Sequence, residues 1–143
     1  MLRPTTFFLF VLLLPLHATA QHEGDNWVFG WNAGLRFKPG GAFSYFSGSQ
    51  NTREGISCIS DKNTGDLLFY TDGIQVWDRN HNTMPNGNGL WGNYSAAQSG
   101  VIIPKPGSDT RYYIFTAPQI NQISTPYAWS EVDMTGNNGL GTN

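Results

Sequence analysis

The sequence predicts an all-β fold in the form of an incomplete β-propeller, with about two antiparallel blades and one additional N-terminal strand. Short apolar runs alternate with clusters of Gly, Asn and Asp, and no long segment after residue 20 has a helical period. Two neighbouring apolar runs recur at a constant offset of 45 residues, which is the length of a four-stranded blade. The chain is 14% aromatic and only 13% charged, a composition typical of a folded, strand-rich protein.

Residues 1–20 are predicted to be a signal peptide. Arg3 supplies a positive start, Phe7 to Leu14 form an unbroken apolar run, and Ala18-Thr19-Ala20 are small residues suited to cleavage. The apolar run is shorter than the roughly 20 residues that span a bilayer. We therefore expect cleavage after Ala20, a partial propeller domain over residues 21–143, no remaining membrane segment, and a secreted or cell-surface location.

The net charge argues against two classes of partner, and the cysteine content rules out an internal disulfide. The formal net charge is −2, so the chain offers no electrostatic footprint for nucleic acid or for an anionic membrane. Cys58 is the only cysteine and lies in the apolar run Ile56 to Ile59, so no disulfide can form within the chain. We interpret Cys58 as a small buried hydrophobic residue, with a reactive nucleophile as the alternative.

Runs rich in apolar and β-branched residues, bounded by turn residues, predict the strands. The predicted strands are Trp27–Phe29, Ala42–Phe46, Gly55–Ser60, Leu67–Thr71, Ile74–Asp78, Gly100–Ile103, Arg111–Ala117 and Tyr127–Asp133.

Two short polar segments predict the turns of a three-stranded meander. Asn63-Thr64-Gly65 joins the third and fourth of these strands, and Asp72-Gly73 joins the fourth and fifth. Asp-Gly tolerates the two positive φ angles of a type I′ turn. Asp72 is therefore explained as a turn residue, and a functional carboxylate is the alternative.

The middle strands have apolar residues at successive positions. Strict alternation directs Leu67 and Phe69 to one face and Leu68 and Tyr70 to the other. The segment from Tyr112 to Phe115 has the same character. Stacked propeller blades bury both faces of a sheet, whereas a sandwich leaves one face in water.

The 45-residue offset supports two blades. It places Gly55–Cys58 on Gly100–Ile103, and Leu67–Thr71 on Tyr112–Thr116. A ring requires at least four blades. We therefore expect the chain to be an N-terminal fragment with exposed strand edges.

The segment from residue 77 to residue 81 is the one candidate binding rim. It places Trp77, Asp78, Arg79 and His81 close together after a strand. In the alternative interpretation, Asp78 and Arg79 pair with nearby loops and Trp77 packs between blades.

Other polar clusters predict no catalytic, cofactor or metal site. Asp61, Asn63 and Asp66 supply too few oxygens for calcium and are explained as turn residues. His81 lacks a second histidine at ligand spacing.

Several segments resemble the N-terminal propeller region of large exported Bacteroidetes proteins that are gliding-motility-associated or type IX-sorted. They are Asn26–Phe37, Glu54–Asn93, Gln98–Thr116 and Glu131–Gly141. The most specific stretches are "DGIQVWDRNHNTMPNG" and "VIIPKPGSDTRYYIFT". The resemblance implies an early N-terminal strand that completes a blade, downstream domains of the same chain as partners, and no carried-over catalytic residues.

Together these observations predict a non-enzymatic, exported β-propeller module for cell-surface adhesion or for binding protein or glycan. One alternative is a secreted glycan-active enzyme, sialidase-like or lyase-like, whose paired carboxylates would lie mostly in further blades. A structural spacer is the other alternative.

Overall fold

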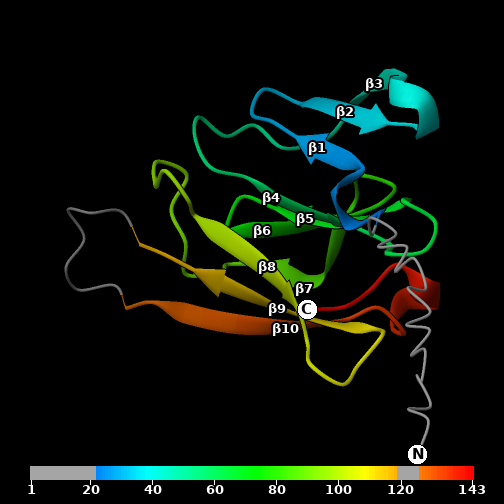
Figure 1. Ribbon diagram of the computed structural model, residues 1–143. Coiled ribbons are helices and arrows are strands. Elements are labelled where there is room, and N and C mark those ends of the chain that lie inside the picture. The colour runs from blue at the N-terminus through cyan, green and yellow to red at the C-terminus, as the bar shows by residue number, and fades with distance from the viewer. Residues whose placement is uncertain (1–21, 119–125) are drawn as a thin grey trace, which may run out of the picture.

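The computed structural model describes residues 22–118 and 126–143, and in them the fold is all-β (Figure 1). The predicted signal peptide lies outside the described residues. The strands are β1 (Asn26–Val28), β2 (Ala33–Phe37), β3 (Phe43–Ser47), β4 (Ser57–Ser60), β5 (Leu67–Thr71), β6 (Gln75–Asp78), β7 (Thr83–Asn88), β8 (Gly100–Pro104), β9 (Arg111–Thr116) and β10 (Ala128–Asp133). Three short 3-10 turns accompany them: η1 (His22–Gly24), η2 (Pro39–Gly41) and η3 (Asn137–Gly139).

The strands form three antiparallel sheets, ordered β1-β2-β3, β4-β5-β6-β7 and β10-β9-β8. Figure 1 shows them as three layers, with the four-stranded sheet in the middle. The first strands of the sheets lie together, because β4 contacts both β1 and β8. The predicted all-β class is thus confirmed, in the form of three open sheets.

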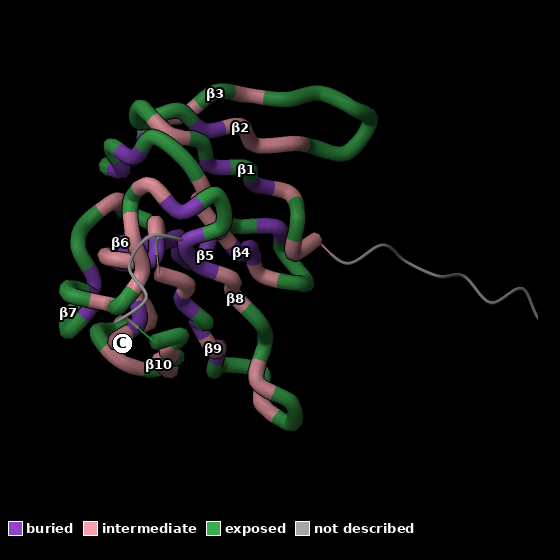
Figure 2. Tube along the Cα trace, turned by 90° about the vertical axis from the view of Figure 1, so that its left-hand side faces the viewer, coloured by how far each residue is buried: buried purple, intermediate pink, exposed green. Residues whose placement is uncertain are grey.

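Two hydrophobic cores hold the layers together, one on each face of the central sheet. The core toward the third sheet contains Ile59, Leu68, Phe69, Val76, Met84, Tyr112, Ile114, Val132 and Met134. The core toward the first sheet contains Val28, Leu67, Tyr70 and Trp77. Burial is accordingly concentrated in the middle of the molecule, and β5 is buried at every position (Figure 2).

The predicted burial of both faces of β5 is confirmed, but the predicted assignment of residues to faces is wrong. Leu68 and Phe69 face the third sheet, whereas Leu67 and Tyr70 face the first. The cause is a β-bulge: Ser60 pairs with Leu67 while Ile59 pairs with Phe69, so Leu68 is the extra residue. A bulge inserts one residue into a strand and interrupts the alternation of its side chains.

The turn between β4 and β5 confirms the prediction for Asn63-Thr64-Gly65. The Asp61 Oδ1 atom accepts the backbone N–H groups of Asn63 and Thr64, and Gly65 has a φ of 71°. Such a carboxylate-capped turn with a glycine in the left-handed region is a common way to close a hairpin.

The predicted type I′ turn at Asp72-Gly73 is wrong. Thr71 pairs with Val76, so residues 72–75 form a longer connection, and only Gly73 has a positive φ, at 85°. The Asp72 Oδ1 atom instead accepts the backbone N–H groups of Ile74 and Gln75 at 2.9 and 2.8 Å. These hydrogen bonds account for Asp72 as a turn residue.

The third sheet is buried on one face only, which corrects the expectation of two covered faces for β9. Tyr112 and Ile114 are buried against the central sheet, whereas Phe115 on the other face is 44% exposed. Among the described residues no further sheet covers this outer face.

The prediction missed β2 and β7, and with β2 it missed the first sheet. β1 pairs with β2 in a sheet of its own rather than completing a blade. Gly34 in β2 marks where the Phe46 ring packs directly on the backbone, so a larger residue there would require the ring to move. In β7, Pro85 and Asn86 are turn residues by local propensity, and Asn86 does adopt a positive φ within the strand.

The 45-residue repeat corresponds to two hairpins, but their pairing registers differ by two residues. Under the offset, Ser57 corresponds to Ile102 and Thr71 to Thr116. Ser57 pairs with Thr71, whereas Thr116 pairs with Gly100. The offset therefore relates the positions of the hairpins and not their hydrogen-bonded pairs.

The outer edge of β7 is partly closed by the last residues of the chain. Pro85 has no backbone N–H to offer, and its carbonyl oxygen accepts the Asn143 N–H at 3.1 Å. The neighbouring residue Thr142 forms a bridge with Asp133 of β10. The segment thus links the edges of the second and third sheets.

Candidate functional site

Two of the four predicted rim residues are part of the packing. The Trp77 ring is buried and stacks on Tyr70 with 5.3 Å between ring centroids. The Asp78 carboxylate is also buried, and its Oδ1 atom accepts the N–H groups of Asn80 and Asn82 at 2.8 and 3.0 Å. For these two residues the structure favours the structural interpretation.

The other two, Arg79 and His81, line a pocket of about 200 Å³ between the first and central sheets. We call it the basic pocket. Its lining residues are Asn26, Arg36, Ser44, Phe46, Leu67, Arg79 and His81.

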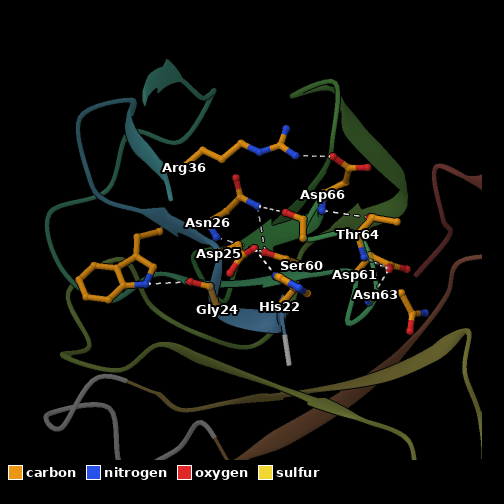
Figure 3. Close-up of polar contacts among 12 residues, drawn as sticks. His22, Gly24, Asp25, Asn26, Arg36, Ser60, Asp61, Asn63, Thr64 and Asp66 are labelled. Atoms are coloured by element: carbon orange, nitrogen blue, oxygen red, sulfur yellow. Dashed lines mark hydrogen bonds and ion pairs between the residues drawn. The ribbon is translucent and has the colours of Figure 1, made fainter. Parts of the chain in front are cut away.

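The first sheet contributes a row of polar side chains to this pocket. Asn26 of β1 pairs with Arg36 of β2, which pairs in turn with Ser44 of β3. Residues in register across a sheet project from the same face. The Asn26 side-chain amide donates to Ser60 Oγ at 2.9 Å and to the Gly65 carbonyl at 2.8 Å (Figure 3). These bonds tie the row to the central sheet.

The central sheet contributes His81, which is held in a defined position. Its Nδ1 atom lies 3.1 Å from Tyr70 Oη, and its ring stacks on Phe46 with 5.6 Å between centroids. Its backbone has a φ of 66°, and its carbonyl accepts the Ser49 hydroxyl at 2.7 Å. Nε2 has no partner among the described residues and remains available as a hydrogen-bonding atom.

The charged groups at the basic pocket include two guanidinium groups and the Asp66 carboxylate, and the buried Asp78 carboxylate directly precedes Arg79 in the chain. Arg36 Nη2 lies 2.6 Å from Asp66 Oδ1 (Figure 3), and this hydrogen bond lowers the pKa of Asp66. Arg79 Nη2 donates to the Gly139 carbonyl at 2.7 Å, so its positive charge is not matched by a carboxylate there. The residues that line the pocket thus include two positively charged side chains and no acidic one.

A second and larger pocket, of about 320 Å³, lies between β7 and β10. We call it the Trp–Asn pocket. Its lining residues are Asn86, Asn88, Gly89, Leu90, Trp91, Thr116, Ala128, Trp129, Ser130 and Asn143.

The Trp–Asn pocket combines two exposed indoles with uncharged polar groups. Trp91 is 56% exposed and Trp129 is 63% exposed, although both are large apolar side chains. The side-chain amides of Asn86 and Asn88 have no hydrogen-bond partner among residues 22–118 and 126–143. Ser130 Oγ donates to the Asn143 Oδ1 atom at 2.9 Å. None of the lining residues is acidic or basic.

The remaining polar candidates are accounted for by turns, ion pairs and burial. Asp61 caps its own turn and Asp66 pairs with Arg36, so the two carboxylates do not converge on one point. No group of three His, Cys, Asp or Glu residues in the described ranges is placed to hold a metal ion. Cys58 is half-buried, its thiol donates to the Asn26 carbonyl, and burial raises its pKa.

Sequence reasoning missed Arg36 and the whole Trp–Asn pocket. Arg36 lies on the strand that was not predicted, and it meets Arg79 only through packing of two sheets. Asn88 and Trp91 are far from Trp129 in the sequence. The "NGNGLWGN" stretch could have indicated this pocket, since it places asparagine side chains close to a tryptophan in a glycine-rich segment, where loops often carry binding residues.

No protein-family model, curated protein or solved structure matches the chain. In the part of the chain that the structure describes, no helix has the length and apolar character needed to cross a membrane.

Proposed function

We propose that this chain is a non-enzymatic, exported β-propeller module that binds neutral glycans at the cell surface. The observation that carries the proposal is the Trp–Asn pocket, where two exposed indoles flank free side-chain amides in an uncharged concavity.

This combination suits the chemistry of a neutral sugar. A pyranose ring has faces of C–H groups, which pack on a flat indole, and hydroxyls, which both donate and accept hydrogen bonds. Trp offers a large rigid apolar surface, and each Asn amide offers two donors and an acceptor. Concave sites with an apolar lining and a few placed polar groups are the usual form of small-ligand sites.

Export and surface location rest on the amino-terminal pattern and on the family resemblance. The charged start, apolar run and small residues before Gln21 have the layout of a secretory signal peptide. The resembling proteins are large exported chains, so downstream domains of the same polypeptide are the proposed partners. The propeller itself is supported by the stacked antiparallel sheets with their first strands side by side.

A glycan array on the full chain tests the proposal, with Trp91→Ala and Asn88→Ala as site variants. Trp91 is more than half exposed and makes no ring contact with another aromatic residue of the described chain, so its replacement should leave the cores intact. We expect each variant to weaken binding about fivefold, because a buried aromatic contact or hydrogen bond contributes about 1 kcal/mol. Tyr127→Ala is the control, since Tyr127 is highly exposed and lies outside the pocket.

Three outcomes separate the interpretations. Binding that depends on Trp91 without turnover in a hydrolase and lyase panel supports the module. Turnover would favour the glycan-active enzyme, and absence of both binding and turnover would favour a structural spacer.

A further inference from the structure

The basic pocket is a second concavity that the neutral-glycan proposal does not use. It lies between the first and central sheets, and it shares no lining residue with the Trp–Asn pocket. Its walls come from strands β1, β2 and β3 on one side and from the start of β5 and the β6–β7 turn on the other.

Its charged groups are suited to a carboxylate. Arg36 and Arg79 are the only charged residues among its lining residues. A guanidinium presents N–H donors in a planar fork that matches the two oxygens of a carboxylate. Arg36 uses Nη2 for Asp66, and Arg79 uses Nη2 for a carbonyl. Each guanidinium therefore keeps further N–H groups for a ligand.

The negative charge of Asp66 does not remove the preference of the basic pocket for a carboxylate ligand. Asp66 is itself exposed, and its carboxylate forms an ion pair with Arg36. Arg79 adds a second positive charge close enough to lower the pKa of Asp66 further. The carboxylate thus orients Arg36, while Arg79 makes no ion pair with a carboxylate within residues 22–118 and 126–143.

The rest of the pocket is uncharged and suited to a ring with hydroxyl groups. Phe46 and Leu67 supply an apolar wall, and Asn26 and Ser44 supply neutral polar groups. His81 is fixed against Phe46 and offers Nε2. At about 200 Å³ the cavity is smaller than a site for a drug-sized molecule. It matches one sugar-sized group.

We propose that the basic pocket binds a uronic acid residue, with its carboxylate between Arg36 and Arg79 and its ring against Phe46 and Leu67. This assigns the chain a binding site for acidic sugar units that is separate from the Trp–Asn pocket. The inference stands independently of neutral-glycan binding, because no residue is common to the two sites.

Ligand-observed NMR titration of the full chain with glucuronate tests the inference, with glucose and glutamate as companion ligands. We expect saturation transfer and a measurable dissociation constant for glucuronate, weaker transfer for glucose and weaker binding of glutamate. Arg36→Gln and Arg79→Gln should each weaken glucuronate binding at least about tenfold, since a charge-assisted hydrogen bond contributes about 1.5–3 kcal/mol.

Arg53→Gln is the matched control. Arg53 is exposed, lies outside the pocket, and makes no ion pair among the described residues. Its replacement removes the same net charge and should leave glucuronate binding unchanged. Far-UV circular dichroism and the unfolding midpoint verify that each variant is folded.

Four results would overturn the inference. They are no glucuronate binding, equal binding of glucose, equal binding of glutamate, and an equal loss of affinity in the Arg53 variant. Trp91→Ala separates the two proposals: it should weaken neutral-glycan binding about fivefold and leave glucuronate binding intact.

Discussion

Replacing Phe69 by Ala tests whether the central sheet is held from both sides. Phe69 is fully buried in the core between the central and third sheets, and its ring meets Tyr112 edge-on with 5.5 Å between centroids. Large-to-small substitution of a buried Phe costs about 3–5 kcal/mol, through lost transfer free energy and the cavity left behind.

Phe115→Ala is the matched comparison, because the same side chain lies on the outer face of the third sheet. Phe115 is 44% exposed. Full burial of a Phe stabilises by about 1.5–3 kcal/mol. A little over half of that burial, without a closed cavity, gives an expected loss of about 1–1.5 kcal/mol.

Urea unfolding followed by tryptophan fluorescence measures both changes. With a slope near 2 kcal/mol per molar urea, Phe69→Ala should lower the midpoint by about 1.5–2.5 M and Phe115→Ala by about 0.5–0.75 M. If Phe69→Ala leaves too little folded protein, Ile114→Val in the same core should lower the free energy of unfolding by about 0.5–1.5 kcal/mol. Equal midpoint shifts for Phe69→Ala and Phe115→Ala would refute the three-layer packing.

Three further perturbations follow from the turns and the thiol. Gly65→Ala should lower the free energy of unfolding in urea by at least about 1–2 kcal/mol, because Gly65 has a φ of 71° and a Cβ there would meet the Asp25 carboxylate. Hydrogen bonds from its turn lower the folded-state pKa of Asp61, so its contribution to stability is present above about pH 4 and is lost as the pH falls through the lowered value. Asp61→Asn, which keeps the acceptor oxygen, should therefore be less stable than the wild type at pH 7 and nearly as stable at pH 2; a constant difference would contradict this. Burial raises the pKa of Cys58, so iodoacetamide should modify the native thiol at pH 7 at least about tenfold more slowly than the urea-unfolded thiol, and equal rates would contradict that assignment.

Much of the fold was predictable because apolar runs and turn residues are local signals. Leu67–Thr71 was predicted with its observed bounds, and most of the other predicted strands begin and end within one or two residues of those observed. The bulge at Leu68 was not predictable, because it depends on how Ser60 pairs across the hairpin. β7 was missed because Pro85 and Asn86 are turn residues by local propensity, although tertiary pairing places them in a strand.

The candidate site was predictable only in part, because it depends on tertiary packing as well as on local sequence signals. A cluster in sequence identified Arg79 and His81, which do line a pocket, but it could not separate them from the buried Trp77 and Asp78. The residues that complete the pocket come from a different sheet. Arg36 reaches it through the register of β2 with β1, and this pairing has no local sequence signal.

The partly closed edge of β7 has a consequence for how copies of this protein behave at high concentration. A strand from another molecule that paired with β7 would lie beside Pro85, which has no backbone N–H to donate. The Pro85 carbonyl oxygen already accepts a hydrogen bond from Asn143. Intermolecular sheet growth, the usual first step toward fibrils, is therefore hindered along this side of the molecule.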